Sequence, residues 1–360
     1  MIYLKKIGFY SAFILPTLLV AGFYLGGRNM LSIHVFTFIL VPLLDYLVSL
    51  DKSNVPANRI SAVSQDRFYR LVTYLWVYIQ LLTILWGFYV VTRYSLSLNE
   101  WLALTTGMAL VTGGVGITVA HEMGHKNTWW EKFYAKVLLM TVCYMHFIIE
   151  HNRGHHVRVA TPHDPATSRY GENFYQFWIR SVIEGYKSAW KLETDRLKSK
   201  NIPLVSLHNQ MVQFTVLPIV FVSLATLAFS IYAGRAVWEV PVLFFAQSFL
   251  AFSLLEIVNY LEHYGMERKL LANGRYEKVT PYHSWNASHT VSNFLLFQLQ
   301  RHSDHHAFAY KRYQVLDHNE NSPQLPAGYS AMLILALFPP LWFKIMNPRL
   351  QQWKKETQKI

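Results

Sequence analysis

The chain has 360 residues, of which 52% are hydrophobic and 15% charged, and its formal net charge is +12. Because soluble domains carry about 25% charged residues, this composition indicates a membrane protein. The single cysteine, Cys143, excludes a disulfide framework, a thiolate zinc site, an iron–sulfur cluster and a fused Cys-x-x-Cys module. Much of the positive charge flanks apolar segments, which favours anionic lipid and acidic proteins over nucleic acid as partners.

Six apolar segments are long enough to cross the hydrocarbon layer, which requires about 20 residues. Short links, such as residues 27–29 and 233–235, predict that the segments pair into three helical hairpins. The first segment is too long for a signal peptide and a second follows at once, so we expect it to stay in the protein. The predicted spans are residues 7–27, 31–50, 70–92, 101–120, 211–233 and 236–259.

Short loops carry more Lys and Arg on one side of the predicted bundle than on the other, and the richer side is normally cytoplasmic. The richer side has Lys5, Lys6, Lys52, Arg59 and Arg67, against Arg28, Arg93 and Arg235. We therefore expect a cytoplasmic N-terminus. We also expect one membrane-embedded domain over residues 1–360, with cytoplasmic catalytic segments at about 121–210 and 260–328.

Two further segments are apolar but are not predicted to cross. Phe133 to Ile149 has histidine clusters before and after it, which must meet on one side, so it is interpreted as a buried or partly inserted helix. Tyr329 to Met346 contains Pro339-Pro340, which bends or ends a helix. The predicted fold class is all-α: six membrane helices in three hairpins, with a histidine-rich cytoplasmic cap.

Three short clusters place histidines three or four residues apart, so that on a helix their imidazoles share one face. With a ninth histidine beyond the sixth span, they exceed the four ligands of one structural zinc site and suffice for two metal ions. Imidazole suits iron, copper, zinc and nickel rather than calcium or magnesium. The candidate ligands are His121, His125, His151, His155, His156, His263, His302, His305 and His306.

Acidic residues lie close to these histidines in the sequence. Metal-bound imidazoles usually donate a hydrogen bond from their other nitrogen to a carboxylate or carbonyl, although solvated ion pairing is the alternative for each acid. The candidates are Glu122, Glu150, Asp164, Glu262 and Asp304. His34, His146, His208 and His318 are interpreted as ordinary core or surface residues, and His283 and His289 are left unassigned.

Glycines in the fourth span lead toward His121. Glycine in a membrane helix usually permits close helix packing, and the lining of a narrow substrate channel is the rival interpretation. Thr37 and Phe38, in the second span, are candidates for residues that limit substrate length, with lipid contact as the alternative. The channel candidates are Thr37, Phe38, Gly113, Gly114 and Gly116.

The sequences of four motifs resemble those of the integral-membrane alkane 1-monooxygenases, members of the membrane fatty-acid desaturase and hydroxylase superfamily. The resemblance covers almost the whole chain, and the chief departure is Met123, where leucine is common. The motifs are His121-Glu-Met-Gly-His-Lys126, Glu150-His-Asn-Arg-Gly-His-His156, Asn259-Tyr-Leu-Glu-His-Tyr-Gly265 and Leu299-Gln-Arg-His-Ser-Asp-His-His306.

The resemblance implies a bacterial inner-membrane enzyme with two iron ions bound by histidines. It implies hydroxylation of the terminal methyl of medium- to long-chain n-alkanes with O2. Electrons would come from rubredoxin, itself reduced by an NAD(P)H-dependent reductase, and no bound flavin or haem is expected. Docking candidates for the donor are Lys126, Arg153, Arg158 and Lys311, with ordinary solvated cations as the alternative.

Two other classes of function stay open. One is a related membrane di-iron oxidase, such as a xylene-type methyl hydroxylase, an epoxidase or a fatty-acyl desaturase. The other is a histidine-rich metal transporter. A transporter is expected to place polar ligands within its spans near the middle of the bilayer, whereas almost all of these histidines lie beyond the span ends.

Overall fold

The computed structural model describes residues 2–357, with side chains from residue 5 onward, and it is almost entirely helical. Six helical segments are long and apolar enough to cross a membrane, as predicted. The largest differences from the predicted ends are four residues, for example 120 against Gly124. The spans are Lys5–Leu25, Gly27–Leu47, Arg67–Arg93, Leu98–Gly124, Gln210–Ala233 and Glu239–His263.

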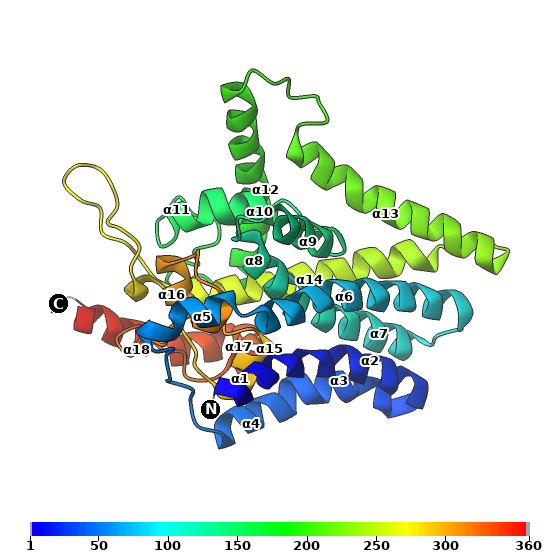
Figure 1. The fold of residues 1–360 in the computed structure, drawn as a ribbon, viewed down its shortest axis with the longest axis horizontal. Helices are drawn as coiled ribbons and strands as arrows, with labels where there is room; N and C mark the ends of the chain where they lie inside the picture. The colour runs from blue at the N-terminus through cyan, green and yellow to red at the C-terminus, as the bar shows by residue number, and fades with distance from the viewer. Residues whose placement is uncertain (1, 358–360) are drawn as a thin grey trace.

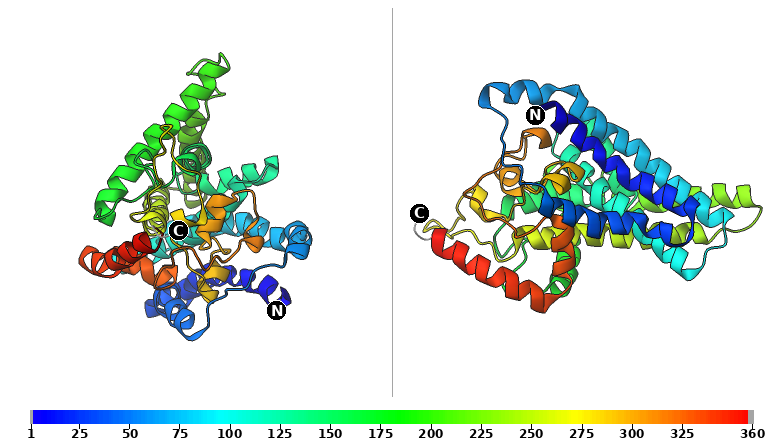
Figure 2. Two further views of the ribbon diagram at one scale, coloured as in Figure 1. Left: turned by 90° about the vertical axis from the view of Figure 1, so that its left-hand side faces the viewer. Right: turned by 90° about the horizontal axis from the view of Figure 1, so that it is seen from below.

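The spans form three hairpins whose tips lie together at one end of the molecule, on the right of Figure 1 and of the right-hand view of Figure 2. The first hairpin is α1 (Ile2–Gly8), η1 (Phe9–Phe13), α2 (Ile14–Leu25), η2 (Gly27–Leu31), α3 (Ser32–Val35), η3 (Phe36–Leu40) and α4 (Val41–Leu47). The second is α6 (Arg67–Arg93), α7 (Leu98–Ala109), η5 (Leu110–Ile117) and α8 (Thr118–Gly124). The third is α13 (Gln210–Ala233) and α14 (Glu239–His263).

The connecting elements gather mainly toward the opposite end from the hairpin tips. They are η4 (Ala57–Arg59), α5 (Ile60–Gln65), α9 (Trp129–Met140), α10 (Phe147–Glu150), η6 (His151–His155), α11 (His156–Arg158), α12 (Phe174–Ser199), η7 (Pro281–His283), α15 (Thr290–Leu295), α16 (His302–Ala307), η8 (Tyr313–Val315), α17 (Tyr329–Ala336) and α18 (Pro339–Thr357). The predicted class of fold, with a histidine-rich cap on three hairpins, is confirmed.

The fourth span is mostly buried, whereas most of the fifth is exposed along its length. The middle part of the fourth span, η5, is a π-helix that packs against α14. A Cβ on Gly113 would lie 2.6 Å from the backbone of Ala251 in α14, so only glycine permits this approach. Gly116 likewise faces the side chain of Gln80 in α6. The fourth span is therefore the central helix of the bundle.

The apolar segment Phe133 to Ile149 is not the single helix that was predicted, because α9 ends at Met140 and α10 begins at Phe147. Helix α9 ends at Met140, and the backbone turns through Cys143, whose φ of 53° is left-handed. Buried amides from two spans satisfy this turn: Gln80 donates to Thr141 Oγ1 at 2.7 Å, and Gln247 donates to the Thr141 carbonyl at 2.8 Å. Backbone at this depth needs such partners because lipid offers none.

The C-terminal apolar segment is bent by 120° between α17 and α18, at the point where Pro339-Pro340 interrupts it. Proline at the start of a helix is tolerated because the missing N–H has no intrahelical partner there. The prediction of a bend or an end at these prolines is thus correct. Tyr329, the first residue of α17, is buried.

Candidate metal centre

The candidate ligands are positioned by the ends of two spans and by three short helices outside the spans. His121 lies in the last turn of the fourth span, and His125 directly follows it. His263 is the last residue of the sixth span. The π-helix η6 and the helix α11 carry the second cluster, and α16 carries the third. Segments far apart in the chain thus present their imidazoles at one end of the bundle.

The first group has five imidazoles, whose Nε2 atoms face one another. His121 Nε2 lies 2.6 Å from His151 Nε2 and 3.2 Å from His125 Nε2. His151 Nε2 lies 3.0 Å from the Nε2 atoms of both His125 and His156. His305 Nε2 completes the group at 3.2 Å from His156 Nε2. All five ligand atoms lie within 4.8 Å of one another.

The second group has four imidazoles, again with Nε2 inward. His306 Nε2 lies 2.9 Å from His302 Nε2 and 3.2 Å from His155 Nε2. His263 Nε2 lies 3.2 Å from His302 Nε2. The four atoms also lie within 4.8 Å of one another. The nine histidines predicted as ligands are therefore brought together in two neighbouring groups of five and four.

Burial favours the neutral form of His151, His156 and His302, in which one ring nitrogen has a free lone pair. Burial, reinforced by neighbouring histidines, lowers the pKa of His151 and of His302 well below the ordinary value, and it lowers the pKa of His156 to about 3. With metal–nitrogen bonds of about 2.1 Å, neighbouring ligands are separated by roughly 3 Å, which is the spacing observed. Nitrogen donors of this kind suit transition metals, so the residues present fit two metal ions.

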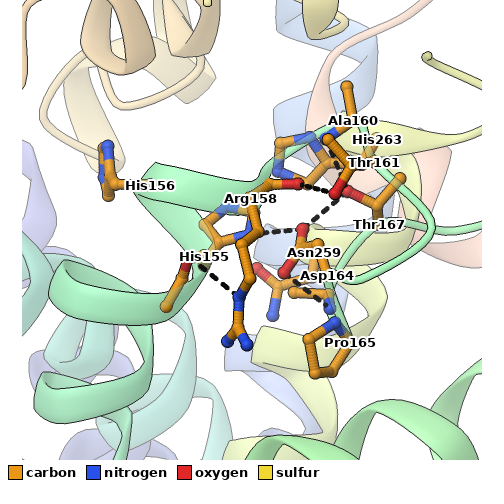
Figure 3. A network of polar contacts seen from close by, with 12 residues as sticks. His155, His156, Arg158, Ala160, Thr161, Asp164, Pro165, Thr167, Asn259 and His263 are labelled. Carbon is orange, nitrogen blue, oxygen red and sulfur yellow. Dashed lines mark hydrogen bonds and ion pairs between the residues drawn. The ribbon is translucent and has the colours of Figure 1, made fainter. Parts of the chain in front are cut away.

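Asp164 is the predicted carboxylate that contacts the outward ring nitrogen of a candidate ligand. Its Oδ2 lies 2.8 Å from Nδ1 of His155, and Thr167 Oγ1 donates to the same oxygen at 2.6 Å (Figure 3). Burial opposes ionisation, but the bonds to His155 and Thr167 outweigh it and lower the pKa of Asp164. The imidazole is thereby fixed with Nδ1–H outward and Nε2 toward the second group.

The other four predicted carboxylates do not take this position. Three face cations: Glu122 lies 3.0 Å from Lys126, Glu150 lies 2.5 Å from Arg158, and Asp304 lies 2.9 Å from Lys311. For these three the ion-pairing alternative is the one that the geometry favours. Glu262 is different, because its Oε2 lies 3.1 Å from the inward Nε2 of His302 rather than from an outward nitrogen.

The four cations predicted for donor docking are all bonded within the protein. Lys126 is only 5% exposed and donates to the Lys311 carbonyl, so its ammonium is not on the surface, contrary to a docking role. Lys311 also pairs with Asp317. Arg153 donates to the Leu192 carbonyl. Arg153 thus links the second cluster to α12, but it is exposed, so its docking role stays a prediction.

An apolar cavity ends at the histidines, with His121, His151 and His302 in its wall. Thr37, Gly113 and Gly114 also line it. No atom lies within 4 Å of a Cβ built on Gly114, so this glycine faces open space.

Two other channel candidates lie away from this cavity. Phe38 lines a neighbouring apolar groove, together with His34. Gly116 packs against Gln80 in α6 and is a helix-packing glycine. Of the three glycines in the predicted channel, Gly114 alone has room for a side chain.

Sequence reasoning missed several residues that support the site. Tyr329 donates to Glu262 Oε1 at 2.6 Å, and nothing in the local sequence signals this contact, since 67 residues separate the two. Arg301 is buried, donates to the carbonyls of Asp51 and Leu316, and so fixes the start of α16. Its position directly before His302 was the available signal.

Comparisons with known proteins agree with this arrangement. Residues 95–335 match the model of the fatty acid desaturase family. The chain is 42% identical to alkane 1-monooxygenase 2 of Pseudomonas aeruginosa over 88% of its length and 82% of that protein. It is 39% identical to alkane 1-monooxygenase 2 of Alcanivorax borkumensis, with 89% and 82% covered. It is 29% identical to the hydroxylase component of a Pseudomonas putida xylene/toluene monooxygenase, with 92% and 85% covered. The chain therefore belongs to the fatty acid desaturase family.

Proposed function

We propose that this protein is an alkane 1-monooxygenase that hydroxylates the terminal methyl of medium- to long-chain n-alkanes. The reaction is RCH3 + O2 + 2e⁻ + 2H⁺ → RCH2OH + H2O. The observation that carries the proposal is the apolar cavity that ends at His121, His151 and His302, because it joins a space suited to a hydrocarbon with both histidine groups. The relatives named alkane 1-monooxygenase support the choice of substrate.

The nine histidines are proposed as the ligands of two iron ions, five on one and four on the other. The irons would supply the activation of dioxygen, which no side chain of the protein performs. The protein would provide the geometry: Asp164 orients His155, and the cation-paired Glu122, Glu150 and Asp304 secure the segments that carry the clusters. The apolar wall would exclude water and present the chain end to the centre.

We place the enzyme in the bacterial inner membrane with its centre on the cytoplasmic side, where short-loop lysines and arginines are richer. Electrons are proposed to come from rubredoxin, reduced in turn by an NAD(P)H-dependent reductase. A separate donor is needed because the chain has one cysteine and so no iron–sulfur module of its own.

A second candidate is hydroxylation of an aromatic methyl group. It is favoured by the likeness to the xylene/toluene monooxygenase component, which extends over 92% of this chain. Both reactions replace a methyl hydrogen by hydroxyl, so they differ in the shape of the substrate that reaches the histidines.

The test supplies purified, iron-loaded protein with rubredoxin, its reductase, NADH and labelled O2. The substrates are a mixture of short to long n-alkanes and, separately, xylenes. Primary alcohols with one labelled oxygen support the proposal. Labelled methylbenzyl alcohols without alkanols favour the second candidate, and alkenes indicate desaturation.

Two variants connect this chemistry to the site. His155→Ala is expected to lose iron and activity while remaining inserted in the membrane. His208→Ala changes an exposed histidine outside both groups and is expected to behave as wild type. An active, iron-replete His155→Ala protein contradicts the ligand assignment.

A further inference from the structure

The two histidine groups are unequal, with five imidazoles in one and four in the other. Glu262 lies beside the smaller group. It directly precedes His263 at the end of α14, and it is 2% exposed. It also lines the apolar cavity. A carboxylate thus lies at the point where the cavity meets the four-histidine group.

The spacing of Glu262 matches that of the ligands themselves. Its Oε2 is 3.1 Å from His302 Nε2, within the range of 2.9 to 3.2 Å that separates His302 Nε2 from the Nε2 atoms of His306 and His263. The other oxygen, Oε1, accepts a hydrogen bond of 2.6 Å from the Tyr329 hydroxyl. Tyr329 therefore fixes the carboxylate with one oxygen directed toward the group.

Glu262 differs from its neighbours in its partners. Glu122, Glu150 and Asp304 each pair with a lysine or arginine, whereas the ion pairs of the described residues give Glu262 only a histidine partner. A histidine Nε2 that binds a metal carries no hydrogen, so His302 would have none to donate. A buried carboxylate oxygen without a donor or a cation is strongly unfavourable. A metal ion held by the four histidines would supply this cation.

We propose that Glu262 is a tenth protein ligand, which binds through Oε2 the metal held by His155, His263, His302 and His306. This inference rests on the proposed function, since it assumes two bound irons. Each iron would then have five protein ligands. One iron would be bound by five nitrogens, and the other by four nitrogens and one carboxylate oxygen. Tyr329 is then a positioning residue, because it acts on the metal only through Glu262.

The test compares Glu262→Gln with Glu256→Gln, a matched control on the same helix. Both glutamates are 2% exposed, but the Glu256 carboxylate accepts hydrogen bonds from Tyr144 and Ser181 and, among the described residues, has no hydrogen bond or ion pair with the nine histidines. Each protein is loaded with ⁵⁷Fe(II), and Mössbauer spectra and the rate of iron release to a chelator are recorded. In wild type we expect two ferrous signals of equal area.

In Glu262→Gln we expect one of the two signals to change while the other stays. We also expect one of the two irons to leave at least about 10-fold faster, since loss of even an outer partner weakens metal binding 10- to 100-fold. Glu256→Gln should match wild type in both measurements. Tyr329→Phe should alter the same signal as Glu262→Gln.

Unchanged spectra and release rates in Glu262→Gln overturn the inference while leaving the two-iron proposal intact. A wild-type protein that binds no iron fails the proposed function instead, so the two failures are distinguishable. If Glu262→Gln does not fold, Glu262→Asp keeps the charge but withdraws the oxygen by one methylene. The same signal should change in that variant, and its persistence is equally contrary to a ligand role.

Discussion

Gly114 is the position at which one substitution should change substrate length without disturbing the bundle. A Cβ placed there meets no atom within 4 Å, and the residue lines the cavity that ends at His121. Gly116, two residues later, would overlap the Gln80 side chain instead. Leucine at position 114 therefore extends into the space proposed for the alkane.

The expected magnitude follows from the volume that the new side chain takes. Leucine adds four carbons, and so displaces about four methylenes of a long substrate from the cavity. At about 0.8 kcal/mol for each buried methylene, the loss is roughly 3 kcal/mol. Because 1.4 kcal/mol is a factor of ten, kcat/KM for long alkanes should fall about a hundredfold relative to short ones.

The assay is competition among n-alkanes of graded length, with primary alcohols quantified by mass spectrometry. Gly114→Leu should retain its iron and shift the product distribution toward shorter chains. Gly116→Ala is the control, and it should lower thermal stability by about 1–3 kcal/mol through overpacking while leaving the chain-length profile unchanged. An unaltered profile in a folded, iron-loaded Gly114→Leu protein refutes the assignment of this cavity to the substrate.

Three more predictions follow from the site and its supports. Asp164→Asn should weaken iron binding about 10- to 100-fold, measured by chelator competition, because it disturbs the bond that orients His155; wild-type affinity would contradict this. Removal of iron should lower the midpoint of thermal unfolding in detergent, since a ligand that binds only the folded state stabilises it. Equal midpoints with and without iron would show that iron does not stabilise the fold. Burial opposes ionisation of Asp51, but hydrogen bonds from Lys5 and Ser53 and the charge of Arg301 lower its pKa. The stabilisation is thus complete above the ordinary pKa of about 4 and is lost as pH falls through the lowered value, so Asp51→Asn should flatten the acid side of a stability–pH curve.

The membrane helices and the histidine groups were predictable because both depend on local patterns. Span length follows from bilayer thickness, and the ends of the fourth span differed by only three and four residues from those predicted. Spacings of three and four residues determine which imidazoles share a helix face. His121 and His125 share one group, and His302 and His306 share the other, as a spacing of four residues predicts.

The partition of the ligands between the two groups was not predictable. His151 shares a group with His156, whereas His155, four residues after His151, joins the other group, because a π-helix such as η6 brings residues five apart onto one face. Figure 3 shows His156 pointing away from the network around His155. Nothing in a run of His-Asn-Arg-Gly-His-His specifies where a π-helix begins and ends.

The carboxylates were the least predictable part, since sequence proximity to a histidine does not specify which nitrogen a side chain meets. Glu122 is adjacent to His121 but lies against Lys126, one helical turn later. Asp164 is nine residues from His155 but reaches its Nδ1 because residues 159–165 turn back. Such loops depend on long-range contacts rather than local spacing.

The buried amides Gln80 and Gln247 connect the fold to the site. Both side chains donate hydrogen bonds to Thr141, so the turn between α9 and α10 lies inside the bundle. This contact fixes the position along the bundle at which η6 begins. Helix α10 then delivers His151 to within 2.6 Å of His121 at the end of the fourth span. An unpaired amide in a membrane bundle costs several kcal/mol, so the pairs with Thr141 are strongly maintained. Polar contacts deep among the spans therefore determine where the histidine clusters meet, although these histidines lie at or beyond the span ends.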